Sequence, residues 1–478
     1  MAVSEVERAS GARRRYEDLP GPRGLPIVGN ARSIKVESLH KTVEAWAGEY
    51  GDIYRFRVGA RRFVGLSDPE LIAKVLRDRP DGFQRGSRLV EISRAFGMEG
   101  VFAANGAAWR RQRPMVLASL DPAHIKSFFP TLTKVTGRLA GRWHQAAATS
   151  TPIDLQADLM RYTVDVTASL AFGTDMNTLE SDGEVIQQHL DKVFPALMKR
   201  AFAAVPYWRW ILLPEDRRVL KHLRALHRAV GDFVSQARKR ISEQPQLREH
   251  PSNLIEALVA ARDREGSAVT DEDVSGNVLT MLLAGEDTTA NTLAWMIWLL
   301  QTHPEAKQRA ADEARRVLAG QPCLASSDQL GSLDYIEACA NETMRLKPVA
   351  PINVAEAVHD TVIADVAIPA GTLVMCVMRR PAVDQRHFPD PTAFRPERWL
   401  SDGSVQSIVS TAKRVAMPFG AGPRVCPGRY LALAEIKSVI AMLLGSFEVH
   451  EVAGPDGQDV VERMSLTMSP VGLRMRLG

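Results

Sequence analysis

Cysteine is scarce in this sequence, and neither sign of charge is in large excess. The four cysteines of the 478-residue chain are scattered without the paired spacing of a zinc site, and a chain this long does not need disulfide bonds to fold. A reducing cytoplasm therefore suits it best. The net charge of +4, from 60 basic and 56 acidic residues, is too balanced to indicate nucleic-acid binding.

The sequence also lacks an uninterrupted apolar run long enough to span a membrane. The stretch 1–19 is polar and has no apolar centre of the kind that a signal sequence or membrane anchor needs, so we expect a solvated tail. The longest apolar run, 278–300, carries Glu286, Asp287 and Asn291 near its middle, where charges would be costly in lipid. We therefore expect no transmembrane anchor.

Helical periodicity dominates what is present. The segment from Asn105 to Thr302 is mainly helical in pattern, and a further helix is expected from Pro69 through Arg77. Helix breaks are predicted near Asp121-Pro122, Gly173, Pro206 and Pro251. Strands are predicted at 53–58, 62–66, 361–368, 447–452 and 471–477. These patterns predict one integrated unit over 20–478, mainly α with a smaller β-rich region.

The clearest single element is a helix over 271–302. Thr270 followed by Asp273 forms a capping box at its start, and Pro304 stops it. At 1.5 Å per residue it should span about 50 Å. Apolar residues fall on all its faces, which predicts a helix that runs through the protein interior.

A glycine-rich decapeptide, 419–428, carries one of the cysteines. It reads Phe-Gly-Ala-Gly-Pro-Arg-Val-Cys-Pro-Gly, and its glycines permit turns and close approaches that a side chain would block. A thiolate presented on such a loop can ligate a haem iron and help it to activate dioxygen. Arg424 is placed to meet a haem carboxylate, and Gly428 would let the next helix lie against the porphyrin. The alternative is an inert, buried Cys426.

Two carboxylates and two hydroxyls interrupt the apolar pattern of the long helix at 284–289, Ala-Gly-Glu-Asp-Thr-Thr. Burying such groups is costly without a purpose. Threonine hydroxyls bond back to the preceding helical turn and glycine weakens the helix, which predicts a local groove where dioxygen could bind. The alternative is a hydrogen-bonded helix kink with no chemical role.

These two segments resemble the haem-binding loop and the oxygen-activation motif of the cytochrome P450 superfamily, and the resemblance runs in the expected order from Pro20 to Gly478. It implies the P450 fold, with haem between the long helix and the cysteine loop, and proton delivery by Asp287 and Thr288. It also implies haem b, with the Cys426 thiolate as iron ligand and cofactor contacts from Trp109, Arg113, Ala284, Phe419, Gly420, Arg424, Cys426 and Gly428.

Two further motifs fit the same family. Trp109 and Arg113 lie four residues apart, on one helical face, where both can reach haem carboxylates. Glu342 and Arg345 lie one turn apart, and by resemblance they form a structural triad with Arg398. Taken alone, a Glu/Arg pair of this kind is weak evidence, because such pairs are common on surfaces.

The sequence departs from the family pattern at two positions. Many relatives have an arginine that reaches a haem carboxylate where this chain has Ala355, so that contact has no assigned residue. Pro427, directly after the cysteine, offers no amide proton to the sulfur and is expected to tune the electron density at iron.

The expected activity is monooxygenation of an apolar small molecule by O2, with electrons from a separate ferredoxin or flavodoxin and its reductase. Alternatives are a peroxygenase or isomerase of the same fold, a non-catalytic haem sensor or electron carrier, and a globular protein without haem. A steroid, terpenoid, fatty acid or polyketide would each suit a pocket of this kind. Candidate lining residues are Phe96, Met98, Phe102, Phe194, Phe202, Val349, Ile352 and Met468, with Asn353 as one hydrogen-bonding group.

Overall fold

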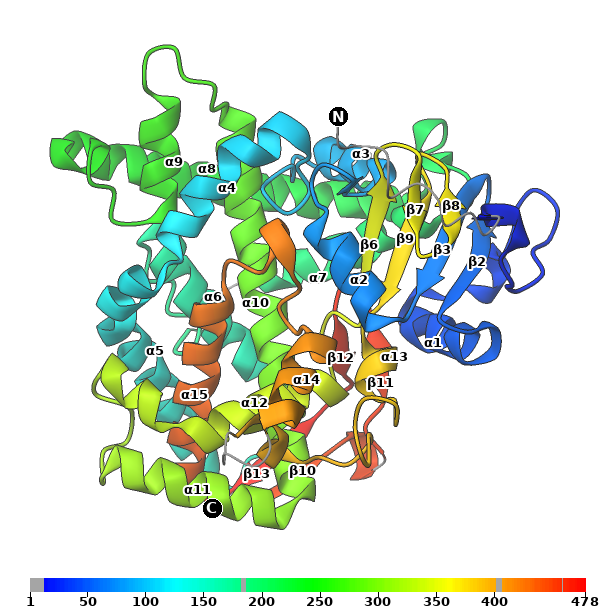
Figure 1. The fold of residues 1–478 in the computed structure, drawn as a ribbon. Helices are drawn as coiled ribbons and strands as arrows, with labels where there is room; N and C mark the ends of the chain where they lie inside the picture. The colour runs from blue at the N-terminus through cyan, green and yellow to red at the C-terminus, as the bar shows by residue number, and fades with distance from the viewer. Residues whose placement is uncertain (1–12, 182–185, 401–405, 458) are drawn as a thin grey trace, which may run out of the picture.

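The long central helix organises the molecule. The computed structural model describes residues 13–181, 186–400, 406–457 and 459–478. Helix α10 (Asp271–Thr302) has the predicted bounds and the predicted capping box, with the Asp273 amide donating to the Thr270 hydroxyl at 3.1 Å. It passes through the middle of the helical part of the molecule (Figure 1), and most of its residues are buried on all sides. The mainly α fold with a smaller β-rich region is therefore confirmed.

Helices form most of the structure and gather on one side of it, around α10 and α15 (Figure 1). Besides α10, the described residues form α1 (Leu39–Tyr50), α2 (Pro69–Arg77), α3 (Ser87–Ala95), α4 (Gly106–Ser119), α5 (Pro122–Ala148), α6 (Leu155–Phe172), α7 (Ile186–Phe202), α8 (Pro214–Glu243), α9 (Leu254–Arg262), α11 (Pro304–Leu318), α12 (Asp334–Leu346), α13 (Arg379–Ala382), α14 (Gln406–Ala416) and α15 (Arg429–Ser446). None of these described helices combines the length and apolarity needed to cross a bilayer.

The predicted helix breaks lie between helices. The Asp121 carboxylate caps α5 by accepting from the His124 amide at 2.7 Å, and Gly173 ends α6 in the left-handed conformation at φ 62°. Pro206 lies between α7 and α8, and Pro251 lies between α8 and α9. Each helix therefore starts or ends at a capping carboxylate, a left-handed glycine or a proline, as local backbone chemistry predicts.

The largest sheet lies beside the helices, on the opposite side of the molecule from α5 (Figure 1). Its strand order is β2-β3-β9-β6-β4, with β3 and β9 parallel and the other neighbours antiparallel. The described residues form the strands β1 (Arg14–Arg15), β2 (Ile53–Val58), β3 (Arg61–Leu66), β4 (Phe83–Gln84), β5 (Ile153–Asp154), β6 (Ile352–Ala357), β7 (Thr361–Ile363), β8 (Val366–Ile368), β9 (Leu373–Val377), β10 (Val449–Ala453), β11 (Glu462–Met464), β12 (Met468–Pro470) and β13 (Arg474–Leu477).

The predicted strand over 361–368 is a hairpin of two strands, because Ala364 adopts a positive φ of 53° between β7 and β8. The stretches predicted at 447–452 and 471–477 form β10 and β13, which pair antiparallel. The observed strand bounds differ little from the predicted ones. A single turn residue within an apolar run hardly changes the alternation of apolar and polar residues from which strands are predicted.

The expectation of a solvated tail through residue 19 is wrong for its described part. Strand β1 pairs in parallel with β8, and Tyr16 and Leu19 are each only 3% exposed. The Tyr16 hydroxyl donates to the carbonyl of Phe56 at 3.0 Å. A few apolar residues within a polar stretch therefore suffice to dock it on the sheet.

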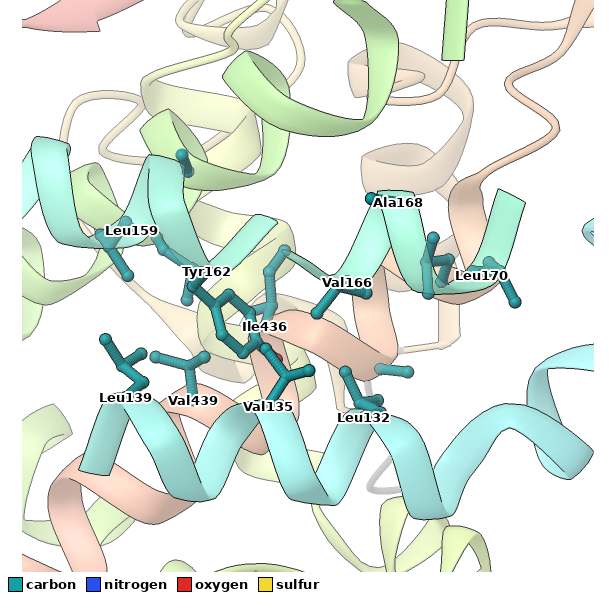
Figure 2. Packing of buried hydrophobic residues seen from close by; sticks show 14 of the residues in the cluster. Leu132, Val135, Leu139, Leu159, Tyr162, Val166, Ala168, Leu170, Ile436 and Val439 are labelled. Atoms are coloured by element: carbon teal, nitrogen blue, oxygen red, sulfur yellow. The ribbon is translucent and has the colours of Figure 1, made fainter. Parts of the chain in front are cut away.

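The main apolar core holds α5, α6 and α15 together. Figure 2 shows Val135 of α5 and Tyr162 of α6 meeting Ile436 of α15, and each of these side chains is at most 1% exposed. This packing fixes α15 at the centre of the molecule. The loop that leads into α15 is the one that carries Cys426.

Candidate functional site

The loop 419–428 joins α14 to α15 and is built on glycine. Gly420 and Gly422 have positive φ values of 74° and 71°, which side-chain-bearing residues rarely adopt. A Cβ at Gly422 would lie 2.5 Å from the carbonyl oxygen of Leu76, so this glycine also lets the loop pack against α2. The Cys426 amide donates to the carbonyl of Phe419 at 2.9 Å and closes the loop.

The Cys426 thiol has a mixed environment. Burial raises the pKa of this thiol, while the Gly428 amide, which donates to the sulfur, and the nearby cations Arg113 and Arg429 lower it. Gly428 thus supplies the backbone hydrogen bond that Pro427 cannot. Cys426 nevertheless keeps partial solvent access, unlike the three other cysteines, which are buried.

Helix α10 contains an accessible spot within a buried stretch. Ala284 is exposed to solvent, although Met281, Leu282 and Leu283 before it are buried. An exposed alanine in the middle of an interior helix marks a gap that other side chains do not fill. The Thr288 hydroxyl donates back to the Ala284 carbonyl at 2.8 Å, as predicted for a hydroxyl at this position.

The carboxylate of Asp287 is held from two sides. Its Oδ1 accepts from the Asn291 amide at 2.6 Å, one turn further along α10, and its Oδ2 accepts from the hydroxyl of Thr467. Thr467 lies in the turn between β11 and β12, is 4% exposed, and comes from a part of the sequence without any motif. The acid is therefore oriented by residues that the sequence pattern did not single out.

Helix α15 contacts α10 through a buried carboxyl group. The Thr289 hydroxyl donates to the side chain of Glu435, which is 1% exposed, and burial raises the pKa of Glu435 to about 8. The carboxyl group is therefore mostly protonated at neutral pH. It ties the helix that follows Cys426 to the helix that carries Ala284.

Four arginines, Arg79, Arg85, Arg113 and Arg424, form a cluster without acidic partners. No carboxylate forms a salt bridge with any of them among the residues that the structure describes. Burial, together with repulsion from Arg79 and Arg424, lowers the pKa of Arg85 to about 9. Burial, together with repulsion from Arg79 and Arg113, lowers the pKa of Arg424 to about 10. Unpaired cations in a protein interior are costly, so the cluster calls for an anion.

The predicted pair Trp109 and Arg113 belongs to this cluster. The Arg424 guanidinium lies 4.8 Å from the centre of the Trp109 ring, and an Arg113 nitrogen donates to the carbonyl of Val425. The Nε atoms of Arg113 and Arg424 are buried without a hydrogen-bond partner. Both arginines therefore keep donors available for an anionic ligand.

Arg79 and Arg85 were missed in the sequence. Arg79 is 3% exposed and donates to Asn353 at 3.4 Å and to the carbonyl of Ala421 at 3.5 Å. Asn353 lies two residues before Ala355 on β6, so Arg79 brings a guanidinium next to the strand where the family's arginine is lacking. The only indication of Arg79 in the sequence is that Ala355 stands where many relatives have an arginine.

The predicted triad is assembled. Both Glu342 and Arg345 are fully buried, and they form two hydrogen bonds of 2.8 and 2.7 Å, while the Nε of Arg398 donates to Glu342 at 3.3 Å. Trp399, from the same short turn as Arg398, donates to Glu342 at 2.9 Å. Arg345 also donates to backbone carbonyls at 382, 391 and 393, so the cluster fixes the chain segment that precedes the cysteine loop.

The candidate pocket residues divide between two apolar clusters. Phe96, Met98 and Phe194 lie in the main core, which includes α10, whereas Phe202 and Ile352 pack against a second cluster near the large sheet. The other four candidate residues make polar or cation–π contacts. The backbone amide of Met468 donates to the carbonyl of Val349 at 2.8 Å. The Arg85 guanidinium lies 4.3 Å from the centre of the Phe102 ring, and Arg79 donates to Asn353.

A partly accessible thiol, an accessible gap on the neighbouring helix and a set of cations without counter-charges together indicate a binding site for an anionic, metal-containing cofactor. Haem b fits these residues. Its two carboxylates would supply the missing negative charges, and its iron would take the thiol as thiolate. The fit rests on the two orphaned Nε atoms and on the exposure of Ala284.

The model of the cytochrome P450 family matches residues 19–477, and the chain belongs to this family. It is therefore a P450 monooxygenase that uses haem b ligated by a cysteine thiolate, together with O2, a substrate and a source of electrons.

Relatives match nearly the whole of this chain at low identity. The chain is 28% identical to a pentalenene oxygenase of Streptomyces avermitilis, over 95% of this chain and 96% of that protein. It is 27% identical to the chloroplastic carotene epsilon-monooxygenase of Arabidopsis thaliana, over 90% and 81%. A self-sufficient cytochrome P450 monooxygenase of Penicillium freii is 26% identical, and the match covers 96% of this chain and 43% of that protein.

Proposed function

We propose that this P450 inserts one oxygen atom from O2 into an isoprenoid hydrocarbon. The observation that carries the proposal is the accessible gap at Ala284. This gap lies about one helical turn from the Asp287 carboxylate and the Thr288 hydroxyl. A small apolar residue there leaves room for a substrate next to groups that hold protons. When bound, thiolate-ligated haem supplies the activation of dioxygen.

The cofactor's two ends are held by different residues. Cys426 ligates the iron, with the Gly428 amide moderating the charge on sulfur. Arg79, Arg85, Arg113 and Arg424 neutralise the two haem carboxylates, and Trp109 supports Arg424 by stacking. Phe419 and Gly420 shape the loop that presents the thiolate. Glu342, Arg345 and Arg398 keep the preceding segment in place and do not take part in the reaction.

Proton delivery falls to Asp287 and Thr288. A carboxylate can take a proton from water and pass it on, and the neighbouring hydroxyl can carry it toward the gap at Ala284. Asn291 and Thr467 fix the direction of the Asp287 carboxylate, since each occupies one of its oxygens. Misdirected protons would release hydrogen peroxide in place of product.

An isoprenoid hydrocarbon is favoured over a fatty acid. Eight of the nine candidate lining residues are apolar, and the amide oxygen of Asn353 already accepts from Arg79. A carboxylate-bearing substrate would need a cation of its own near the gap, and the clustered arginines serve the haem. Two of the relatives bear names that refer to isoprenoid hydrocarbons, pentalenene and carotene.

Electrons come from a separate ferredoxin or flavodoxin with its reductase, in the cytoplasm. Arg110 and Arg111, the basic positions next to Trp109, form ion pairs with Asp81 and Asp273. The exposed Lys413 and the partly exposed Arg429, which flank the cysteine loop, are therefore the better candidates for contact with an acidic partner.

The first test is a carbon monoxide difference spectrum of the dithionite-reduced protein, followed by turnover of pentalenene with NADPH, a ferredoxin, its reductase and ¹⁸O₂. We expect a red-shifted thiolate-type Soret band and one labelled oxygen atom in the product. Cys426→Ser should abolish the band, and Cys339→Ser, at a buried cysteine away from the site, should not. A neutral-ligand band in fresh wild-type protein would contradict the thiolate assignment.

Two alternatives give different results in the same assay. A peroxygenase or isomerase forms product without NADPH, and a sensor or electron carrier is reduced efficiently yet turns nothing over. A product that carries no ¹⁸O, formed in the presence of NADPH, would therefore contradict monooxygenation of this substrate.

A further inference from the structure

A glutamine at the start of α6 contacts the side chain that holds the Asp287 carboxylate. Gln156 is the second residue of α6, and its Nε2 donates to the Oδ1 of Asn291 on α10 at 3.1 Å. The Nδ2 of Asn291 in turn donates to the Asp287 carboxylate at 2.6 Å and to the Asp287 carbonyl at 2.8 Å. Hydrogen bonds therefore connect α6 with the acid that lies next to Thr288.

The other side of Gln156 is bonded to a backbone amide. The Gly472 amide, between β12 and β13, donates to the Oε1 of Gln156 at 3.1 Å. Gly472 has a positive φ of 66°, and a Cβ there would lie 2.8 Å from the Cγ of Pro455, so both the backbone conformation and the available space favour glycine. A backbone N–H group can only donate, which fixes the direction of the bonds that follow.

The direction of these hydrogen bonds follows from the first one. Because Gly472 donates, Gln156 presents its carbonyl oxygen to Gly472 and its NH2 group to Asn291. Asn291 then accepts through its own side-chain oxygen and turns its NH2 group toward Asp287. We call this series, from Gly472 through Gln156 and Asn291 to Asp287, the amide chain. All its N–H groups point toward the Asp287 end, and hydrogen bonds aligned in this way polarise one another.

The backbone segments that carry the amide chain are tied to each other by further hydrogen bonds. The Leu155 amide donates to the carbonyl of Leu473 at 3.2 Å, directly beside the first bond of the chain. Strand β13 also pairs with β5, the strand that leads into α6. Further along α6, the Thr163 hydroxyl donates to the carbonyl of Glu286 on α10 at 3.1 Å. The amide chain therefore joins elements whose relative positions are already fixed.

The direction of the Asn291 amide matters because the amide chain ends on a carboxylate. An N–H group stabilises an ionised carboxylate, whereas a carbonyl oxygen in the same place repels it. An asparagine can present either end, since a half-turn about its last bond exchanges oxygen and nitrogen. Gln156 donates to the oxygen of Asn291, and together with the Asp287 carbonyl it favours the orientation in which nitrogen faces the carboxylate.

We propose that Gln156 is a positioning residue: it fixes the direction of the Asn291 amide and, through it, the Asp287 carboxylate. The consequence for turnover rests on the proton-delivery role proposed above for Asp287 and Thr288. An amide does not release its proton near neutral pH, so the amide chain orients the acid and conducts no protons. Gln156 acts through Asn291 and is not itself a catalytic residue.

The first test compares two substitutions of Gln156 in the haem-loaded protein. In Gln156→Glu both carboxylate oxygens accept, so the NH2 group of Asn291 is drawn away from Asp287, whereas Gln156→Leu only removes the donor. During pentalenene turnover we expect Gln156→Glu to raise the hydrogen peroxide released per NADPH severalfold, and more than Gln156→Leu does. A simple tie between helices is kept by glutamate and lost with leucine, so the reverse order would overturn the proposal.

The control variant is Gln145→Glu, which adds the same charge at an exposed position near the end of α5 and should leave the coupling unchanged. All variants are first checked for the thiolate-type carbon monoxide band, which separates a local effect from misfolding. In an Asn291→Ala background the effect of Gln156→Glu should vanish, because no amide remains to be turned. An effect that persists there would be direct repulsion between carboxylates, and it would overturn the proposal.

The orientation of Asn291 can also be followed without turnover. The diamagnetic ferrous carbon monoxide complex, labelled with ¹⁵N-asparagine, gives side-chain amide resonances in NMR spectra, and Asn291→Ala identifies the pair from Asn291. We expect this pair to shift further in Gln156→Glu than in Gln156→Leu, and to stay in place in Gln145→Glu. No shift in either Gln156 variant would overturn the proposal. The expected shifts with unchanged coupling would support the amide chain and contradict the proton-delivery role of Asp287.

Discussion

Replacing Glu435 with glutamine should change how the stability of this protein depends on pH. The side chain is 1% exposed on α15, and burial raises its pKa to about 8 from the value of 4.5 usual for glutamate, while the Thr289 hydroxyl opposes the rise. Between these two values the folded protein keeps the proton that the unfolded chain loses. The free energy of unfolding therefore falls as pH rises through this window, by about 1.4 kcal/mol per pH unit from this one group.

The size of the effect follows from the width of the window. From pH 5.5 to 8 the wild type should lose about 3 kcal/mol that the glutamine variant does not lose, because glutamine does not titrate. The amide also introduces a buried NH2 group, which costs about 1–3 kcal/mol at every pH if it finds no acceptor. The variant is therefore expected to start below the wild type at pH 5.5 and to approach or exceed it at pH 8.

The measurement is the urea midpoint of the haem-loaded proteins, followed by far-UV circular dichroism at pH 5.5, 6.5, 7.5 and 8. The control is Glu448→Gln, since the Glu448 side chain is 79% exposed and should leave the pH profile unchanged. The decisive quantity is the difference between variant and wild type as a function of pH. A constant difference across the range would refute the reasoning, since it would mean that Glu435 titrates at its ordinary pKa.

The other perturbations concern the site itself. Thr288→Ala should raise hydrogen peroxide released per NADPH oxidised severalfold at the expense of product, and unchanged coupling would remove the proton-carrying role of the hydroxyl. Thr467→Val should have the same effect more weakly, because the Asp287 carboxylate loses one donor, and Thr467→Ser should restore the wild-type value. Arg79→Gln should speed haem transfer to apomyoglobin about tenfold and lower the midpoint potential by tens of millivolts, since a nearby positive charge is removed. Equal transfer rates and potentials would show that Arg79 does not reach the cofactor.

Motifs that lie within one element could be predicted from the sequence. The bounds of α10 follow from Thr270, Asp273 and Pro304, and the positive φ values of Gly420 and Gly422 follow from the spacing of glycine around a cysteine. These features depend on local capping and backbone chemistry, which a single sequence records.

Features that depend on contacts between distant segments could not be predicted. Thr467 meets Asp287 across 180 residues, and Arg79 meets Asn353 across 274, and neither threonine nor arginine is unusual where it stands in the chain. Glu435 looks like an ordinary helical acid until the packing of α6 and α10 around it is known. The docking of Tyr16 on the sheet was missed for the same reason.

The four clustered arginines also bear on how the protein is made and lost in a cell. Until haem arrives, a newly synthesised chain must hold four guanidinium groups together without a carboxylate partner, and this repulsion favours local opening of the cofactor site. A ligand that binds only the folded state stabilises it by an amount that grows with the ligand's free concentration. Haem supply would thus set the lifetime of this polypeptide, and a haem-starved cell would clear it through proteolysis before any shortage of substrate was felt.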